Sequence, residues 1–151
     1  MRNHNKTAIL KQKVVSLVTE EKPFLRLKQV QTTPEVGKTP ARGVLDDGFE
    51  LHKAAKADFE VRAKHLDRTQ RVNWTVKQFR SLGNKLFEIK WKTGDVQWRA
   101  LGYDDKDGYF VVVKLCTHKM EVYDPPKCIE SARTEKTAAE AGQKKVIGYV
   151  L

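Results

Sequence analysis

The spacing of hydrophobic positions changes from a helical to a strand pattern halfway along the chain. Between residues 45 and 66, apolar side chains recur at steps of three or four, which predicts one amphipathic helix. From residue 86 onward apolar and polar residues alternate, which predicts strands over residues 86–91, 96–103 and 109–117. Gly94 and Gly108 lie in the short connections between these strands, so we expect an antiparallel meander. The helical stripe consists of Leu45, Phe49, His52, Ala55, Phe59, Ala63 and Leu66.

The segments before and within this framework have weaker patterns. Residues 1–22 contain a stripe at helical spacing that Pro23 would end, and residues 24–31 alternate like a short strand. Residues 32–42 contain Pro, Gly and Thr without periodicity, which indicates a linker. The Thr75-x-x-Gln78 spacing is typical of a capping box and predicts a second, shorter helix that ends at Gly83.

The C-terminal part is predicted to contain a helix and one more strand. Pro125 and Pro126 suit the first turn of a helix that runs to about Ala141, and residues 146–151 then form a final edge strand. The order of elements predicts an α+β fold, with a twisted, mainly antiparallel sheet of about three to five strands. Two helices would pack on one face of this sheet, and a C-terminal helix would follow it. Residues 1–42 are expected to form an N-terminal extension and residues 43–151 the folded domain.

Positive charge is spread over the whole chain. The 29 Lys and Arg side chains outnumber the 19 acidic ones, which gives a net charge of +10. Residues 1–75 carry a net charge of +6 and residues 76–151 carry +4, so the charge does not belong to a detachable tail. An excess of this size favours a polyanionic partner such as nucleic acid. No secretory signal and no run approaching about 18 apolar residues is present, so we expect a cytoplasmic location and no membrane contact.

The two cysteines of the chain, Cys116 and Cys128, are expected to be free thiols that line the core. Together with His118 they form a C-x-H pair and one distant Cys. That set lacks the paired spacing of structural zinc sites. We therefore expect no metal and no cofactor.

Candidate catalytic side chains lie at polar positions of the meander. Antiparallel pairing would bring Lys90, Arg99, His118, Lys119 and Tyr123 toward one end of the sheet. Cleavage of RNA by its own 2′-hydroxyl needs a base, cations that stabilise the pentavalent phosphorane, and an acid for the leaving 5′-oxygen. The planar fork of Arg99 can contact two phosphate oxygens, and His118 titrates near neutral pH. Clustered cations lower the pKa of a lysine so that it can act as a base, and Tyr123 can stack on a base or donate its proton.

Three further residues of the strands, Lys92, Trp98 and Lys114, are expected to contact RNA. An ordinary explanation exists for each basic residue taken singly. Cations on the solvent face of an antiparallel strand are solvated, and at a sheet edge they discourage aggregation. The hypothesis of RNA contact therefore depends on the whole set and not on any one member.

Short motifs in this region resemble one family of proteins. They are LFEIK at residues 86–90, WRAL at residues 98–101, an apolar strand ending in THK at residues 117–119, and PP at residues 125–126 before a helix. Their order resembles the RelE/HigB superfamily of toxin ribonucleases, and most of all its phage-derived HigB-type branch. The ending EVY at residues 121–123 is similar to the RelE branch, where a tyrosine at that place belongs to the active site. The likeness covers about residues 45–141.

The resemblance implies a RelE-like fold that cleaves messenger RNA without a metal, often on the ribosome. It also implies a protein antitoxin, of helix-turn-helix type, that masks or distorts the site. Lys90, Arg99 and Lys119 match the basic residues of the family's site, and Tyr123 matches its tyrosine. The chain departs from the family at the turn, where Lys119-Met120 replaces a Lys-Lys pair and no Phe precedes it. His118, a residue type that some members use, is the expected substitute.

Three functions stay open on these grounds. The first is a HigB/RelE-like endoribonuclease, the toxin of a toxin–antitoxin pair. The second is a non-catalytic basic protein of phage type that holds nucleic acid or an acidic protein partner through the same sheet. The third is a virion or host-takeover structural protein whose N-terminal arm mediates assembly. Toxic expression with RNA cleavage distinguishes the first function from the others, whereas steep salt dependence of RNA binding without cleavage favours the second.

Overall fold

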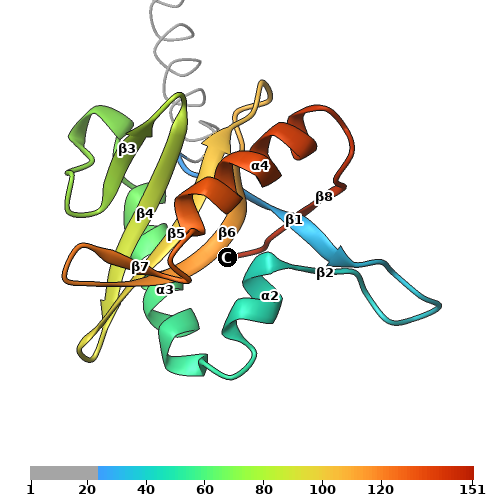
Figure 1. Ribbon diagram of the computed structural model, residues 1–151, viewed down its shortest axis with the longest axis horizontal. Coiled ribbons are helices and arrows are strands. Elements are labelled where there is room, and N and C mark those ends of the chain that lie inside the picture. The colour runs from blue at the N-terminus through green and yellow to red at the C-terminus, as the bar shows by residue number, and fades with distance from the viewer. Residues whose placement is uncertain (1–23) are drawn as a thin grey trace, which may run out of the picture.

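The structure, a computed structural model, describes residues 24–151, and the helix predicted within residues 1–22 lies outside this range. The described part of the chain is an α+β fold with one mixed eight-stranded sheet and three α-helices (Figure 1). The helices are α2 (Val44–Phe49), α3 (Lys53–Asp67) and α4 (Cys128–Glu140). The strands are β1 (Leu27–Thr33), β2 (Arg42–Gly43), β3 (Phe79–Gly83), β4 (Leu86–Thr93), β5 (Val96–Asp104), β6 (Phe110–Lys119), β7 (Val122–Asp124) and β8 (Val146–Gly148).

The centre of the sheet is the meander that the alternating pattern predicts. β4, β5 and β6 pair antiparallel in sequence order, and each extends one or two residues beyond its predicted end. The order across the sheet is β2-β1-β6-β5-β4-β3, with β7 paired to β6 and β8 paired to β1. β1 runs parallel to β6, while the other strand pairs are antiparallel. The sheet is therefore larger than predicted and contains one parallel pair.

Helices cover both faces of the sheet. α2 and α3 pack on one face, where the ring centroids of Phe59 and Trp91 lie 4.9 Å apart. α4 packs on the opposite face, where Cys128 and Ala132 are buried against β5 and β6 (Figure 1). α4 covers only part of its face, which leaves the rest of that face open to polar side chains. None of the helices within residues 24–151 is long and apolar enough to cross a membrane.

The prediction of a helix that begins at Thr75 is wrong. The chain makes a short 3-10 turn at Arg71–Asn73 and then enters β3, which pairs with β4. The capping contact survives in part, because the backbone N–H of Thr75 donates to Oε1 of Gln78 at 3.3 Å. Phe79 instead stacks on Phe87 of β4 with ring centroids 5.2 Å apart. Tertiary pairing with β4 has therefore overridden the local helical spacing.

The long helical stripe of residues 45–66 forms two helices and not one. α2 ends at Phe49 and α3 begins at Lys53, with a break at Leu51 and His52. The His52 ring packs against the Trp98 indole with ring centroids 5.1 Å apart, so His52 lies at the edge of the core.

Residues 27–33, assigned from the sequence to the N-terminal extension, form β1 inside the sheet. Gln29 of β1 is almost fully buried and ties this strand to α2. Its Nε2 donates to Asp46 at 3.0 Å, and its Oε1 accepts from the Leu45 backbone N–H at 3.0 Å. The predicted final strand is present as β8, which pairs with β1. The expected boundary between residues 42 and 43 therefore falls inside β2, within one sheet.

Candidate active site

Polar side chains gather on the part of the α4-covered face that α4 leaves open. Lys90 of β4 pairs with Arg99 of β5, and Gln97 of β5 pairs with His118 of β6. His118 pairs in turn with Tyr123 of β7. Residues directly opposite each other on paired strands share a face, so the structure brings Lys90, Arg99, His118 and Tyr123 together.

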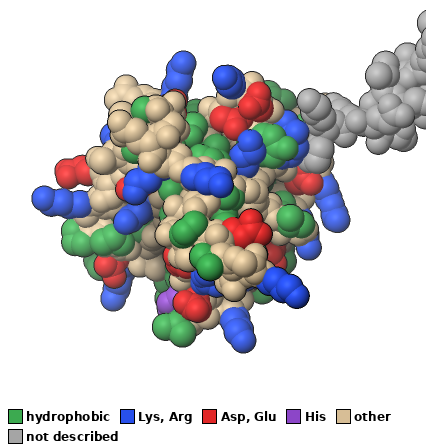
Figure 2. Space-filling model, turned by 90° about the vertical axis from the view of Figure 1, so that its right-hand side faces the viewer, with side chains coloured by type: hydrophobic (Ala, Val, Ile, Leu, Met, Phe, Trp, Pro, Cys, Tyr) green, Lys and Arg blue, Asp and Glu red, His purple; other side chains and the backbone are tan. Residues whose placement is uncertain are grey.

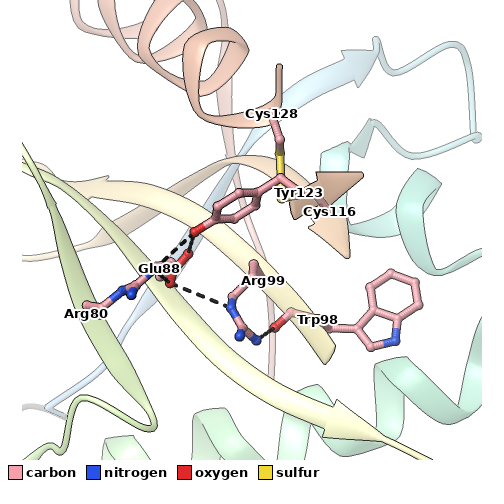
Figure 3. The surroundings of a disulfide bond; sticks show 7 residues. All are labelled: Arg80, Glu88, Trp98, Arg99, Cys116, Tyr123 and Cys128. Carbon is pink, nitrogen blue, oxygen red and sulfur yellow. Dashed lines mark hydrogen bonds and ion pairs between the residues drawn. A yellow bond between two sulfur atoms is a disulfide. The ribbon is translucent and has the colours of Figure 1, made fainter. Parts of the chain in front are cut away.

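A buried carboxylate, Glu88, lies at the centre of this cluster (Figure 3). Its Oε1 pairs with the Arg80 guanidinium at 2.8 Å and with Nε of Arg99 at 3.6 Å. The Tyr123 hydroxyl donates to its Oε2 at 2.6 Å. Arg80 also donates to the Tyr123 hydroxyl at 3.3 Å. Two cations and a phenol therefore surround one carboxylate that has no exposed surface.

Three contacts, with Glu88, Trp98 and Gln97, together orient Arg99. With Nε facing Glu88, the two terminal nitrogens of Arg99 donate to the Trp98 carbonyl at 2.9 Å and to Oε1 of Gln97 at 2.7 Å. Arg99 is 5% exposed, and with Lys90 and Lys92 it lines an open pocket at the surface. A pre-oriented planar cation at the rim of such a pocket can bind a phosphate without first losing rotamer freedom.

The surroundings of His118 favour its neutral form. Partial burial, followed by the positive charges of Arg99 and Arg80, lowers the pKa of the imidazole below its usual 6.5. The His118 and Tyr123 rings pack edge to face with centroids 4.7 Å apart. Because a neutral imidazole accepts a proton, His118 is suited to act as a general base at neutral pH.

Lys90 and Tyr123 are perturbed in opposite senses. Burial and the neighbouring Arg99 charge lower the pKa of Lys90, whose Nζ donates to the Val76 carbonyl at 3.1 Å. Burial and the hydrogen bond to Glu88 raise the pKa of Tyr123 to about 12. Tyr123 therefore keeps its proton and directs it at Glu88, which leaves Lys90 as the better proton donor to a leaving group.

Of the other residues named from the sequence, Lys92 lies beside this cluster, whereas Trp98 and Lys119 lie on the opposite face. Trp98 is 7% exposed and points to the opposite face, where it packs against Phe49 and Trp91, so the expected contact with RNA is corrected (Figure 3). Lys119 is exposed at the end of β6, and strand alternation places it on the other face from His118. Lys92 is exposed and pairs with Gln97, on the face of Lys90. Lys114 pairs with Leu101, next to the area that α4 covers.

The two cysteines form a disulfide, which corrects the expectation of free thiols. Cys116 of β6 pairs in register with Arg99, and Cys128 is the first residue of α4. The bond therefore fastens the start of α4 beside the cluster around Glu88 (Figure 3). Among residues 24–151, no group of three His, Cys, Asp or Glu side chains is arranged to hold a metal ion.

Glu88 and Arg80 are the members of the cluster to which the sequence assigned no role. Arg80 lay inside the helix wrongly predicted from Thr75, and Glu88 looked like an ordinary polar position of a strand. The usable signal was a single acidic residue in a strand whose other polar positions are Lys90 and Lys92. No protein-family model matches the chain, and no curated protein or solved structure is significantly similar to it.

Proposed function

We propose that the protein is a RelE/HigB-like endoribonuclease that cleaves messenger RNA by attack of the 2′-hydroxyl, without a metal. The observation that carries the proposal is the placement of a histidine of lowered pKa on the same sheet face as Lys90 and Arg99. Base, acid and phosphate-binding cation are thus present in one cluster. The order β4, β5, β6, Pro125-Pro126 and α4 also supports the RelE-like arrangement that the motifs suggest.

In this mechanism His118 takes the proton of the 2′-hydroxyl while the O2′–P bond forms. Arg99 stabilises the charge of the phosphorane with its terminal nitrogens. Lys90 then gives a proton to the 5′-oxygen as the P–O5′ bond breaks. The products are a 2′,3′-cyclic phosphate and a 5′-hydroxyl, and the two side chains exchange their protons with water. Glu88 faces Arg99 and Tyr123 donates its hydrogen bond to Glu88, and neither side chain transfers a proton in this mechanism.

The biological setting proposed with this activity is that of a toxin in the cytoplasm. Cleavage on the ribosome would provide the messenger RNA substrate, and a cognate antitoxin of helix-turn-helix type would block the site. The pocket lined by Lys90, Lys92 and Arg99 is the basic surface that both partners would have to reach. RNA would be bound there through its phosphates, and the antitoxin would cover the same cations.

One observation favours the second candidate function, a non-catalytic protein that binds polyanions. Nε of Arg99 faces Glu88, and the Tyr123 hydroxyl is engaged by the same carboxylate. A cation that already has a buried counter-charge is a weaker electrophile toward a phosphorane than a free one. The same sheet would then hold nucleic acid or an acidic protein without cleaving anything.

The test is incubation of the purified full chain with labelled mRNA, with and without ribosomes, in the presence of EDTA. The expected result is cleavage to 2′,3′-cyclic phosphate ends, slowed by about 10²- to 10³-fold in Arg99→Ala. Arg68→Ala is the matched control, because Arg68 is an exposed arginine at the end of α3. Intact RNA in every reaction, while the protein still retains RNA on a filter, would replace this proposal with the binding function.

A further inference from the structure

A pocket of about 390 Å³ opens at the uncovered edge of β4, next to the cluster around Glu88. β3 pairs with β4 only as far as Ile89, so the rest of β4, up to Thr93, has no neighbouring strand on that side. Lys90 and Lys92 of β4 and Arg99 of β5 line the pocket. Arg62 of α3 and Lys77, from the turn before β3, line it as well.

The pocket carries five cations and no carboxylate. This differs from the adjacent pocket on α3, which shares Arg62 but is also lined by Asp58. Arg62, Lys77 and Lys92 form no ion pair with any carboxylate of residues 24–151. Cations gathered in this way repel one another, and an anion that enters the pocket relieves the repulsion.

Arg62 adds an independent argument for a bound anion. Its side chain is half-buried, and burial alone lowers the pKa of its guanidinium. The cluster around Glu88 shows how this fold treats a buried arginine, since Arg99 has a carboxylate at 3.6 Å. Arg62 has lost part of its hydration without gaining such a partner. A ligand with negative charge would replace the stabilisation of the guanidinium that water no longer provides.

We propose that this pocket binds a second phosphate of a single-stranded RNA, adjacent along the strand to the phosphate that reacts. The inference rests on the proposed function for the identity of the ligand. Lys90 and Arg99 belong both to the pocket and to the catalytic cluster, so a strand that places one phosphate at Arg99 can place its neighbour between Arg62 and Lys77. The pocket is too small for a duplex, and the forked guanidinium of Arg62 suits two oxygens of one phosphate.

The test measures binding of a 2′-O-methyl RNA decamer, which cannot be cleaved, to the full chain over a range of salt concentrations. The double variant Arg62→Gln/Lys77→Gln is compared with Arg68→Gln/Lys38→Gln, which removes the same charge from exposed positions outside the pocket. Loss of one phosphate contact lowers the slope of log K against log salt by about 0.7 for a single strand. It also weakens binding about tenfold at fixed salt, and the control pair leaves both quantities near the wild-type values.

Equal slopes and affinities in the two double variants would overturn the inference, as would tighter binding of a polyglutamate peptide of equal charge. Thermal unfolding of each variant verifies that it is folded. The proposed function is assayed separately by cleavage of unmodified RNA. Cleavage with no effect of Arg62→Gln/Lys77→Gln on binding refutes the second phosphate site alone. A reduced slope without any cleavage supports the phosphate site and refutes the ribonuclease.

Discussion

The buried carboxylate of Glu88 accepts a hydrogen bond from Tyr123 and faces Nε of Arg99 at 3.6 Å, so it contributes to the positions of both side chains. An arginine held by a buried partner cannot sample the rotamers of a solvated one. The benefit for a phosphate site is orientation, and the cost is partial neutralisation of the cation. The role of Glu88 is therefore to position Arg99. Loss of the contact should lower the free energy of unfolding directly, and it should affect activity only through the position of Arg99.

Glu88→Gln is expected to destabilise the protein by about 3 kcal/mol, because it leaves the Arg99 charge buried without its counter-charge. The measurement is urea unfolding of the two proteins, read as the free energy of unfolding. Glu140→Gln is the control, since Glu140 pairs with Lys136 but is half exposed. That change should cost less than about 1 kcal/mol. Equal losses in the two variants would show that the contacts of Glu88 are no stronger than those of a surface ion pair.

The lowered pKa of His118 predicts how the rate of the proposed cleavage depends on pH. Its lowered pKa means that the imidazole is already neutral at pH 7 and becomes protonated only below pH 6.5. As the proposed general base it acts in the neutral form, so the rate should be full at neutral pH and fall only in the acidic range below the usual imidazole pKa of 6.5. The acid limb should disappear in His118→Gln, together with most of the activity. An acid limb centred above pH 7, or one that persists in His118→Gln, would assign the base to another group.

At the scale of elements, the sequence predicted those strands and helices that are determined by residues close to one another in the chain. β4, β5 and β6 were predicted because alternation and short glycine-containing turns act over a few residues. α4 was predicted because two prolines and Gly142 mark its two ends. β3 was missed because Phe79 takes its conformation from β4, which lies later in the chain. The insertion of β1 beside β6 was missed for the same reason, since parallel pairing of distant segments leaves no local signal.

The residues of the candidate site also fall into those that the sequence could predict and those that it could not. Lys90, Arg99, His118 and Tyr123 could be grouped from the sequence because strand register alone brings them together. Trp98 was misplaced because an aromatic residue in a half-buried strand looks the same whether it faces a helix or a ligand. Glu88 was missed because alternation gives the face of a residue but not whether another element covers it. The arrangement of α4 over that face decides burial, and it depends on contacts that no short window contains.

The disulfide joins two elements and should stabilise their packing. Cys116 and Cys128 are 12 residues apart, and closing a loop of that length is worth about 3 kcal/mol in the unfolded-chain entropy model. Reduction is therefore expected to lower the free energy of unfolding by about that amount. The measurement is urea unfolding with and without a non-thiol reductant.

The matched control for the disulfide is the double variant Cys116→Ser/Cys128→Ser, on which the reductant should have no effect. Alkylation in denaturant, followed by mass spectrometry, identifies the bonded state directly. The oxidised protein should incorporate no label until it is reduced. Two labelled cysteines before reduction would show that the pair stands as thiols in the purified protein.

At the scale of the whole molecule, the net charge of +10 is distributed along the chain, with +6 in residues 1–75 and +4 in residues 76–151. Figure 2 shows one face on which Lys and Arg side chains are spread over the surface with Asp and Glu between them. Such a surface attracts polyanions from many directions but does not orient them. Orientation must then come from the open end of the sheet, where Arg99 is fixed by Glu88 and a pocket without a carboxylate lies beside it.

The whole charged surface attracts polyanions, whereas only the site around Arg99 orients them. This difference predicts how the protein should act in a cell. Expression of the wild-type chain in bacteria should stop growth and fragment messenger RNA, because the ribonuclease activity proposed here would act on a substrate that every cell needs. Arg99→Ala should abolish both effects, since it removes the oriented cation, while net charge falls by only one unit from +10. Arg68→Ala loses the same charge from an exposed position and should stay toxic.

Growth rate and RNA sequencing of cleavage ends are the two measurements. Equal growth arrest by the wild type and by Arg99→Ala would attribute toxicity to general binding by the charged surface and remove the oriented site from the explanation.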